Sequence, residues 1–346
     1  MKNHLNLDLD PYEDAADALR IRKITKKRTF SRKKKSMTAG LPEESVALSA
    51  IAEEENRFLF SYHASRHEKV WLEASLGGMY QQKWIDDVLR LVKGGKEATV
   101  YLCKGSESSG TDLLAAKVYR PRQFRNLKDD HIYRQGRAWL DESGLPIYKD
   151  GELNAIRKGT AFGWELMHTS WIEYEYQTLV NLHEAGADVP KPYVHGNNAI
   201  LMEYIGDEGT PAPVLNSVDL TRAEARELYQ RVLHNLELFL AHNRIHGDLS
   251  AYNILYWGGD ITLIDFPQVV DATSNPNALR IFERDLVRVS EYFARFGVQT
   301  DPRRTAHRLW TAAHHRLVEP LDPRYLDADN PEDRRLWEKQ QKQKHG

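Results

Sequence analysis

The sequence predicts an α+β protein in which a small mixed sheet with one helix is followed by a mainly helical lobe. Short apolar runs typical of strands gather in the first part of the chain, and longer runs at helical spacing dominate after residue 217. Apolar residues form 41% of the 346-residue chain and charged residues 28%, which indicates a folded protein with a sizeable core. The single cysteine, Cys103, excludes an intramolecular disulfide and a cysteine-rich metal site, and we expect it to be buried.

Residues 1–45 are expected to form a disordered basic arm, because they lack sustained apolar periodicity. The segment Arg20–Lys35 carries ten basic residues and no acidic one, although the formal net charge of the chain is only −2. Such a run is a candidate contact for the phosphates of RNA or of a ribosomal subunit, and a solvated tail without a dedicated partner is the alternative. The sequence contains no apolar stretch of about 18 residues, so we expect no membrane partner and a cytoplasmic location.

Residues 46–80 have helical apolar spacing and few helix breakers, so we expect a helical extension that packs on or next to the catalytic core. The same spacing recurs in Trp84–Val92, where Gly94 and Gly95 follow as helix terminators, and this predicts a further helix. Residues 81–204 as a whole are expected to form the sheet-containing lobe.

Within this lobe, Ala98–Cys103 and Leu113–Tyr119 flank a turn-forming segment and predict a hairpin. Residues from about 121 to 158 are polar and charged, which predicts a flexible loop. Trp171–Leu182 is expected to be a helix that ends near Gly186, and two further short strands are expected around residues 195–198.

Residues 205–346 are expected to form the mainly helical lobe with a polar C-terminal tail. A helix is predicted from Ser217 or Thr221 to His242, with a capping side chain at its start. Two apolar runs joined by Gly258–Asp260 predict a second hairpin, and the chain after Asp285 has helical composition.

The strongest chemical signal is the segment Ile245–Leu255, which reads IHGDLSAYNIL, together with Asp265 at the end of the next apolar run. Asp248 and Asn253 have the D-x-x-x-x-N spacing of a kinase catalytic loop, in which the Asp accepts or orients the acceptor proton and the Asn oxygen binds metal. Asp265 takes the place of the catalytic, metal-binding aspartate that opens D-F-G. Oxygen ligands of this kind suit a hard cation such as magnesium. His246 is expected to support the backbone rather than to transfer protons.

Lys117 is a lone lysine in the apolar run Ala115–Tyr119, and it matches the strand lysine that contacts ATP phosphates in kinases. A buried ammonium group needs a partner, because an unpaired charge in the interior is costly. Glu175 is the candidate partner on the predicted helix, and Glu173 is the competing assignment.

Two weaker signals concern the rest of a nucleotide site. The turn Lys93–Glu97 contains small residues whose amides can cradle phosphate, and Lys96 could add charge, although the G-x-G-x-x-G pattern is absent. The run Leu201–Ile205 turns polar where a hinge would bind adenine, so Glu203 and Ile205 are candidate contacts. An ordinary core strand is the alternative reading of this run.

Together these motifs resemble the RIO family of atypical serine protein kinases. Their sequences are most similar to bacterial-type members and to the first RIO subfamily. The resemblance covers about residues 84–293. The matching segments are GKEATVY at 95–101, AAKVYR at 115–120, VPKPY at 189–193, GTPAPVL at 209–215, HGDLSAYNIL at 246–255 and LIDFPQ at 263–268. The chain departs from the family at Lys93 and Gly94, where a Ser-Thr pair is common, and at Pro267, which replaces the glycine of D-F-G.

The resemblance implies a bilobal protein-kinase-like fold with a trimmed C-terminal lobe. It implies ATP with Mg²⁺ or Mn²⁺, serine autophosphorylation or action on another protein, and an ATPase switch as a further activity. It also implies that Asp248 is catalytic and that Asp265 binds metal and receives a phosphoryl group as an aspartyl-phosphate. Eukaryotic and archaeal members of the family act in maturation of the small ribosomal subunit.

Two other classes of protein remain open. A small-molecule kinase similar to the aminoglycoside phosphotransferases also carries H-G-D-x-x-x-x-N and I-D-F, but the GKEATVY turn and the long separation of Lys117 from Glu175 disfavour it. A nucleotide-dependent assembly factor that binds RNA or the ribosome would use the same residues as a kinase, so the sequence does not separate the two. An ordinary protein kinase is disfavoured because no A-P-E motif follows Asp265.

Overall fold

The computed structural model describes residues 58–120, 135–196 and 198–313. The chain divides into two compact units. Of the described residues, unit 1 contains 58–120, 139–180, 190–196 and 198–212, and unit 2 contains 135–138, 181–189 and 213–313. Within the described ranges both helices and sheets are present, which confirms the α+β class. The arm 1–45 and the polar tail after residue 313 lie outside the described residues.

The described part of unit 1 is built on a five-stranded sheet in the order β1-β2-β3-β5-β4. All four pairings are antiparallel, so the expected mixed sheet is wrong in this respect. The predicted hairpin is confirmed as β2 and β3, and the two later strands are confirmed as β4 and β5. The strands are β1 (Ile85–Gly94), β2 (Ala98–Gly105), β3 (Leu113–Tyr119), β4 (Pro192–His195) and β5 (Ala199–Glu203).

Strand β1 corrects the helix that the sequence predicts for Trp84–Val92. It is an edge strand, and its register against β2 shifts at three places. Each such irregularity disturbs the alternation of side chains that a regular strand would show. Its two buried residues, Ile85 and Val88, are therefore three positions apart, as they would be on one face of a helix. Local apolar spacing could not reveal this difference.

Helix α3 (Arg66–Gln81) belongs to the core of unit 1. Ser65 and Glu68 form a capping box at its start, which satisfies backbone N–H groups of the first turn. Its apolar face shares one cluster with Val88, Tyr101 and other sheet residues; the helix contributes Trp71, Leu72, Leu76 and Met79. The expectation that the segment packs on the core is confirmed for this part of it. Residues 58–65 are not helical, and 46–57 lie outside the described residues.

Two described helices, α5 and α6, follow β3 in the chain. Helix α5 (Asp150–Arg157) lies within the segment predicted as a loop, of which 121–134 fall outside the described residues. None of its residues is buried, so it lacks the apolar stripe by which sequence reasoning finds a helix. Helix α6 (Ala161–Glu184) confirms the predicted helix and begins ten residues before Trp171. A Cβ at Gly163 would lie 2.1 Å from the carbonyl oxygen of Ala155, so the junction of α5 and α6 requires glycine.

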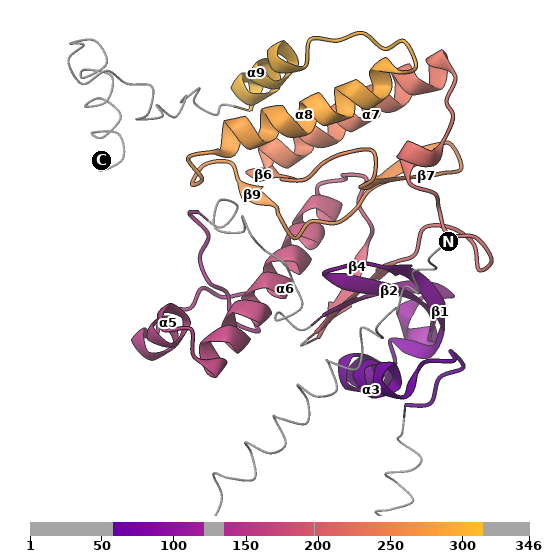
Figure 1. The fold of residues 1–346 in the computed structure, drawn as a ribbon, viewed down its shortest axis with the longest axis vertical. Coiled ribbons are helices and arrows are strands. Elements are labelled where there is room, and N and C mark those ends of the chain that lie inside the picture. Colours follow the sequence, from indigo (N-terminus) through magenta and orange to yellow (C-terminus); the bar gives the residue numbers. More distant parts are fainter. Residues whose placement is uncertain (1–57, 121–134, 197, 314–346) are drawn as a thin grey trace, which may run out of the picture. The chain divides into compact units, whose positions relative to one another are not determined.

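Between residues 213 and 313, unit 2 combines three α-helices with two short two-stranded sheets. Helix α7 confirms the predicted helix and begins after the capping residue Thr221, the later of the two predicted starts; it runs beside α8 (Figure 1). The predicted second hairpin is confirmed, and its turn residues Gly258 and Gly259 have φ values of 61° and 97°, which favour glycine. The elements are η3 (Leu215–Ser217), α7 (Arg222–Ala241), β6 (Arg244–Ile245), β7 (Ile254–Trp257), β8 (Asp260–Leu263), β9 (Val270–Asp271), α8 (Ala278–Ala294) and α9 (Pro302–Ala312).

Among the helices that the structure describes, none combines the length and the apolar character needed to cross a bilayer. Cys103 lies in β2 with no exposed surface, as expected, and burial raises the pKa of its thiol.

Replacing Leu72 by alanine tests whether α3 carries part of the core of unit 1. Because Leu72 has no exposed surface, Leu72→Ala should lower the free energy of unfolding by about 2–5 kcal/mol. The control Val70→Ala changes a side chain of the same helix that is 48% exposed, and it should change stability by less than about 0.5 kcal/mol. Urea denaturation followed by circular dichroism and tryptophan fluorescence measures both. Equal effects would show that α3 is not part of the core.

Candidate functional site

Lys117 and Glu175 form a buried ion pair in unit 1. Lys117 Nζ lies 2.6 Å from Glu175 Oε1, and the exposed fractions of the two side chains are 10% and 2%. The Tyr119 hydroxyl donates a hydrogen bond of 2.9 Å to Glu175 Oε2, so both carboxylate oxygens have a donor. A buried charge pair is tolerated when geometry and further hydrogen bonds satisfy it. The predicted pairing of Lys117 with Glu175 is confirmed.

Glu173, the competing partner, has a different environment. Its Oε2 lies 3.0 Å from Nε2 of His195 in β4, and its Oε1 accepts a hydrogen bond of 2.9 Å from Gln177. Residues two apart on a helix do not face the same side, so Glu173 and Glu175 meet different parts of the unit. Both carboxylates are buried at 1% exposure, which is why burial alone could not decide between them.

The turn between β1 and β2 contains Lys96. The amide of Gly95 donates a hydrogen bond of 2.9 Å to the carbonyl of Ala98, and a Cβ at Gly95 would approach that oxygen to 2.8 Å. The turn is therefore tight and brings backbone close to backbone. Lys96 is exposed and forms no ion pair with another residue of the described ranges.

The end of β5 has the features of a hinge. The carbonyl of Ile205 accepts a hydrogen bond of 3.0 Å from Ala212, whereas its amide donates none within the described part of the chain. Glu203 is exposed, and its carboxylate accepts a hydrogen bond of 3.1 Å from the amide of Lys191. Gly206 has a φ of 134°, and a Cβ there would lie 2.5 Å from the Thr210 carbonyl oxygen, so the chain turns sharply after Ile205.

In unit 2, the loop that carries Asp248 is fixed at the preceding residue. Gly247 has a φ of 85°, and a Cβ there would lie 2.1 Å from the carbonyl oxygen of Gln268. Its amide donates a hydrogen bond of 2.8 Å to Asp285 Oδ2, and its carbonyl accepts one from the guanidinium of Arg284. Asp285 is 1% exposed, and burial raises the pKa of its carboxyl group, although His246, Arg284 and the Gly247 amide oppose the shift.

His246 supports the same loop and does not face solvent. It is 1% exposed, its Nε2 lies 3.0 Å from the carbonyl oxygen of Ile264, and its Nδ1 accepts a hydrogen bond of 3.3 Å from the amide of Asp248. In this arrangement Nε2 faces an acceptor and Nδ1 accepts from the backbone, so both ring nitrogens contact the main chain. Its ring also packs against Phe266 at a centroid distance of 4.7 Å. The expected backbone role of His246 is confirmed.

The carboxylate of Asp248 is half-exposed and contacts a cation. Its Oδ1 accepts a hydrogen bond of 2.8 Å from Arg288 in α8, and 46% of its side chain is exposed. Asn253 Nδ2 donates a hydrogen bond of 2.9 Å to the backbone carbonyl of Asp248. The two residues of the D-x-x-x-x-N motif are thus joined within one loop.

Asn253 and Asp265 lie at the same end of the β7–β8 hairpin. The pairing Ile254↔Leu263 continues in a hydrogen bond of 3.0 Å from the Ile264 amide to the Asn253 carbonyl, and Asp265 is the next residue. Because Asn253 Nδ2 donates its hydrogen bond within the loop, Oδ1 is the atom of this amide that could bind a metal. Asp265 is exposed and has a φ of 72°, a costly backbone conformation for an aspartate that is often found at functional sites.

These donors fit a magnesium ion that shares its ligands with phosphate. Mg²⁺ is commonly held by one or two protein oxygens, with substrate phosphates and waters completing its shell. In keeping with this, the described residues contain no group of three or more His, Cys, Asp or Glu side chains that could hold a metal by themselves.

A model of the RIO domain family matches residues 105–306, more than half of the chain. This chain belongs to the RIO family. It is 35% identical to the serine/threonine-protein kinase RIO1 of Homo sapiens over 215 residues. This aligned stretch covers 62% of this chain and 34% of the human protein. It is 28% identical over 231 residues to the protein of the same name from Caenorhabditis elegans, 66% of this chain and 40% of that protein. The chain thus spans well under half of these two relatives.

The shorter RIO-type serine/threonine-protein kinase Rio1 of Thermoplasma acidophilum is 36% identical over 132 residues, 38% of this chain and 68% of that protein. The RIO domain match includes every candidate residue from Lys117 to Asp265 and excludes Lys96, which precedes residue 105.

Two residues with a direct bearing on this RIO domain's catalytic loop were missed by sequence reasoning. Asp285 and Arg288 bond to Gly247 and Asp248 from 38 and 40 residues away, and both lie on α8. Apart from Ser290, the other buried residues of α8 are apolar or aromatic, so a charged residue among them was the available signal for Asp285. No local pattern distinguishes Arg288 from other exposed arginines.

Replacing the two helix glutamates separately tests the role of the ion pair. Glu175→Gln should lower kcat/KM for ATP at least about tenfold, because removing one partner of a buried pair leaves an uncompensated charge. Glu173→Gln removes an equally buried carboxylate on the same helix and should retain most of the activity. Steady-state kinetics at varied ATP, with thermal melts of both variants, separates function from folding. Equal kinetic losses would contradict the assignment.

Proposed function

We propose that this protein is an ATP- and magnesium-dependent RIO-type serine/threonine protein kinase. The observation that carries the proposal is the loop in which Asp248 and Asn253 are joined by a hydrogen bond, followed by Asp265 at the open end of the hairpin. Phosphoryl transfer requires mainly positioning and charge, and this loop supplies the carboxylates and the amide oxygen that such a reaction uses. The printed names of the relatives, serine/threonine-protein kinases, support the same activity.

Asp248 is the proposed proton acceptor. The acceptor hydroxyl oxygen forms a bond to the γ-phosphorus of ATP, the bond from that phosphorus to the β–γ bridging oxygen breaks, and ADP leaves with that oxygen. The proton of the hydroxyl passes to the Asp248 carboxylate. This requires Asp248 to be reachable, and its 46% side-chain exposure is suitable.

Unit 1 would supply the contacts to the nucleotide. Lys117, held by Glu175, offers a fixed ammonium group for phosphate oxygens. The amide of Ile205 and the backbone of Glu203 would bind adenine at the hinge, and the tight turn with Lys96 would cover phosphates. Tight fixation of Lys117 favours specific phosphate binding, because little side-chain freedom is lost when ATP binds.

Asn253 and Asp265 would hold the divalent cation, which supplies positive charge that stabilises the phosphates during transfer. Mn²⁺ accepts the same oxygen ligands as Mg²⁺, so either ion is expected to support activity. Family resemblance adds that Asp265 can itself receive the phosphoryl group, which would make an ATPase cycle a second use of the same residues. The acceptor is another protein or the chain itself.

Removing the two carboxylates tests the proposal directly. Asp248→Ala and Asp265→Ala should each reduce phosphoryl transfer to background, because one loses the proton acceptor and the other a metal ligand. Each protein is incubated with radiolabelled ATP and magnesium, and the label is measured in phosphoprotein and in free phosphate. Arg303→Gln, an exposed change on α9, serves as the unchanged control. Full activity of Asp248→Ala would contradict the mechanism, and label transfer to an added aminoglycoside but not to protein would favour the small-molecule kinase.

A second proposed property concerns the basic arm, which lies outside the described residues. The ten basic residues of Arg20–Lys35 suit the phosphates of RNA, including ribosomal RNA, in a cytoplasmic assembly role. Nucleic acid binding of this kind would be independent of base sequence, since the run contains no element that reads bases.

Deleting residues 1–36 should weaken binding to a generic RNA and flatten the dependence of affinity on salt, because fewer counterions are released. Fluorescence anisotropy of a labelled RNA at several salt concentrations measures both. The phosphorylation activity of the shortened protein should persist, which keeps this property separate from catalysis. Unchanged RNA affinity would show that the run is a tail without this partner.

A further inference from the structure

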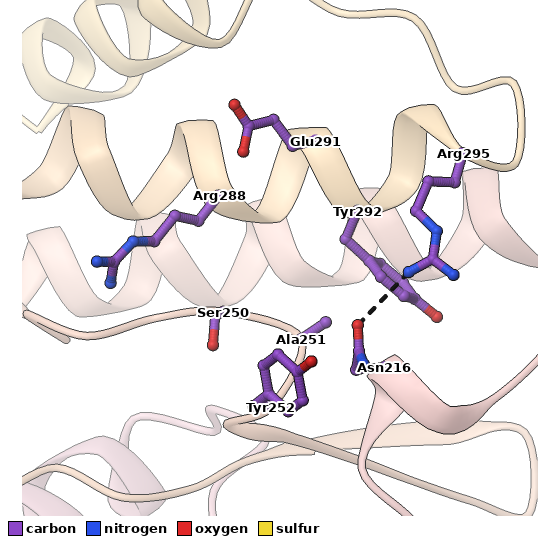
Figure 2. Close-up of a pocket in the computed structure, with 8 residues that line it drawn as sticks. All are labelled: Asn216, Ser250, Ala251, Tyr252, Arg288, Glu291, Tyr292 and Arg295. Atoms are coloured by element: carbon purple, nitrogen blue, oxygen red, sulfur yellow. Dashed lines mark hydrogen bonds between the residues drawn. The ribbon is translucent and has the colours of Figure 1, made fainter.

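A pocket of about 300 Å³ lies beside the catalytic loop within unit 2 (Figure 2). Ser250 and Tyr252, which line it, lie between Asp248 and Asn253 in the sequence, so one wall is the catalytic loop itself. Helix α8 forms another wall through Arg288 and other residues. A ligand in this pocket would lie close to the proposed proton acceptor.

The positive charge of the pocket is not fully neutralised. Arg288 is paired with Asp248 at 2.8 Å, whereas Arg295 forms no ion pair with any carboxylate of the described residues. Arg295 Nη1 donates a long hydrogen bond of 3.5 Å to Asn216 Oδ1. Glu291 also lines the pocket, but its carboxylate points away from Ser250 and Tyr252 (Figure 2). The exposed guanidinium of Arg295 is therefore open to an external anion.

Aromatic side chains hold this guanidinium and extend the surface. The Tyr292 hydroxyl donates a hydrogen bond of 2.6 Å to the Leu215 carbonyl, which fixes the ring, and the Arg295 guanidinium carbon lies 5.4 Å from that ring's centroid. Tyr252 is 61% exposed, although a large aromatic side chain is usually covered. Exposed tyrosine beside arginine is a composition typical of surfaces that bind polypeptides.

We propose that this pocket binds an acidic or phosphorylated side chain of the acceptor polypeptide, with Arg295 as the residue that selects it. The inference rests on the proposed protein kinase function and adds a substrate class to it. Arg288 and Arg295 are seven residues apart on α8, which corresponds to about 10 Å along the helix. About three residues of extended chain span that distance. An acceptor whose hydroxyl reaches Asp248 would thus place an acidic residue two or three positions away at Arg295.

The experiment compares wild type, Arg295→Gln, Arg295→Glu and the control Arg303→Gln, an exposed arginine outside the pocket. The acceptors are peptides with one serine in a neutral sequence, in which a single glutamate or lysine is moved from four positions before the serine to four after it. Phosphorylation gives kcat and KM for each peptide, and fluorescence anisotropy gives its affinity without turnover. ATP hydrolysis without peptide gives the basal activity.

Wild type should favour glutamate two or three positions from the serine by about three- to tenfold, through KM rather than kcat. Arg295→Gln should lose this preference, Arg295→Glu should favour lysine at the same position, and Arg303→Gln should behave as wild type. Basal hydrolysis should be the same in all four proteins.

The inference would be overturned if wild type showed no preference for the position of the glutamate in phosphorylation or in binding. It would also be overturned if the Arg295 and Arg303 variants behaved alike. A third contrary result would be displacement of the peptide by a short RNA whose own binding requires Arg295. The last result would assign the pocket to nucleic acid phosphate. Failure of the proposed kinase function would look different. Transfer of phosphate from ATP would then be the same in wild type and Asp248→Ala, while fluorescence anisotropy would still detect peptide binding that depends on Arg295.

Discussion

The loop of unit 2 that carries Asp248 and Asn253 depends on a buried carboxylate that lies outside the loop. Asp285 accepts the amide of Gly247, and the left-handed backbone at Gly247 leaves no space for a side chain. Without this acceptor the amide would be buried and unpaired, which costs about 1–3 kcal/mol. His246 adds its bond to the Ile264 carbonyl, so one connected network fixes α8, the loop and the end of the hairpin. The positions of Asp248 and of Asp265 follow from these contacts.

In unit 1 a buried ion pair, rather than a hydrogen-bond network, fixes the position of the candidate side chain. The buried pair of Lys117 and Glu175 does not need to be stabilising, because apolar side chains of similar volume often serve a core equally well. Its presence in a strand whose other residues are almost all apolar fits the proposed use of the Lys117 charge to bind phosphate. The hydrogen bond from Tyr119 completes the carboxylate's contacts and limits Glu175 to one orientation. The result is a lysine whose position is set before any ligand binds.

How far the sequence predicts this molecule depends on the range of the interactions concerned. The Asp248–Asn253 spacing and the β7–β8 turn are local, so both were predicted from neighbouring residues. Strand β1 was mistaken for a helix because its register shifts place buried residues three apart. The choice of Glu175 over Glu173 depends on how α6 packs against the sheet, and both residues are buried. Asp285 acts across 38 residues, a separation at which sequence patterns carry no pairing information.

Charge acts at two ranges in this protein. The chain has a net charge of −2, so the ten basic residues of Arg20–Lys35 leave −12 for the rest. Such a balance repels acidic acceptors at long range, but at physiological salt this repulsion is screened beyond about 8 Å. A contact at Arg295 acts within that distance, and the cation–π packing on Tyr292 keeps its guanidinium in place. A net acidic protein therefore needs a positively charged side chain with a fixed position if it is to select an acidic acceptor. Attraction of RNA phosphates is instead suited to an extended run of positive charges.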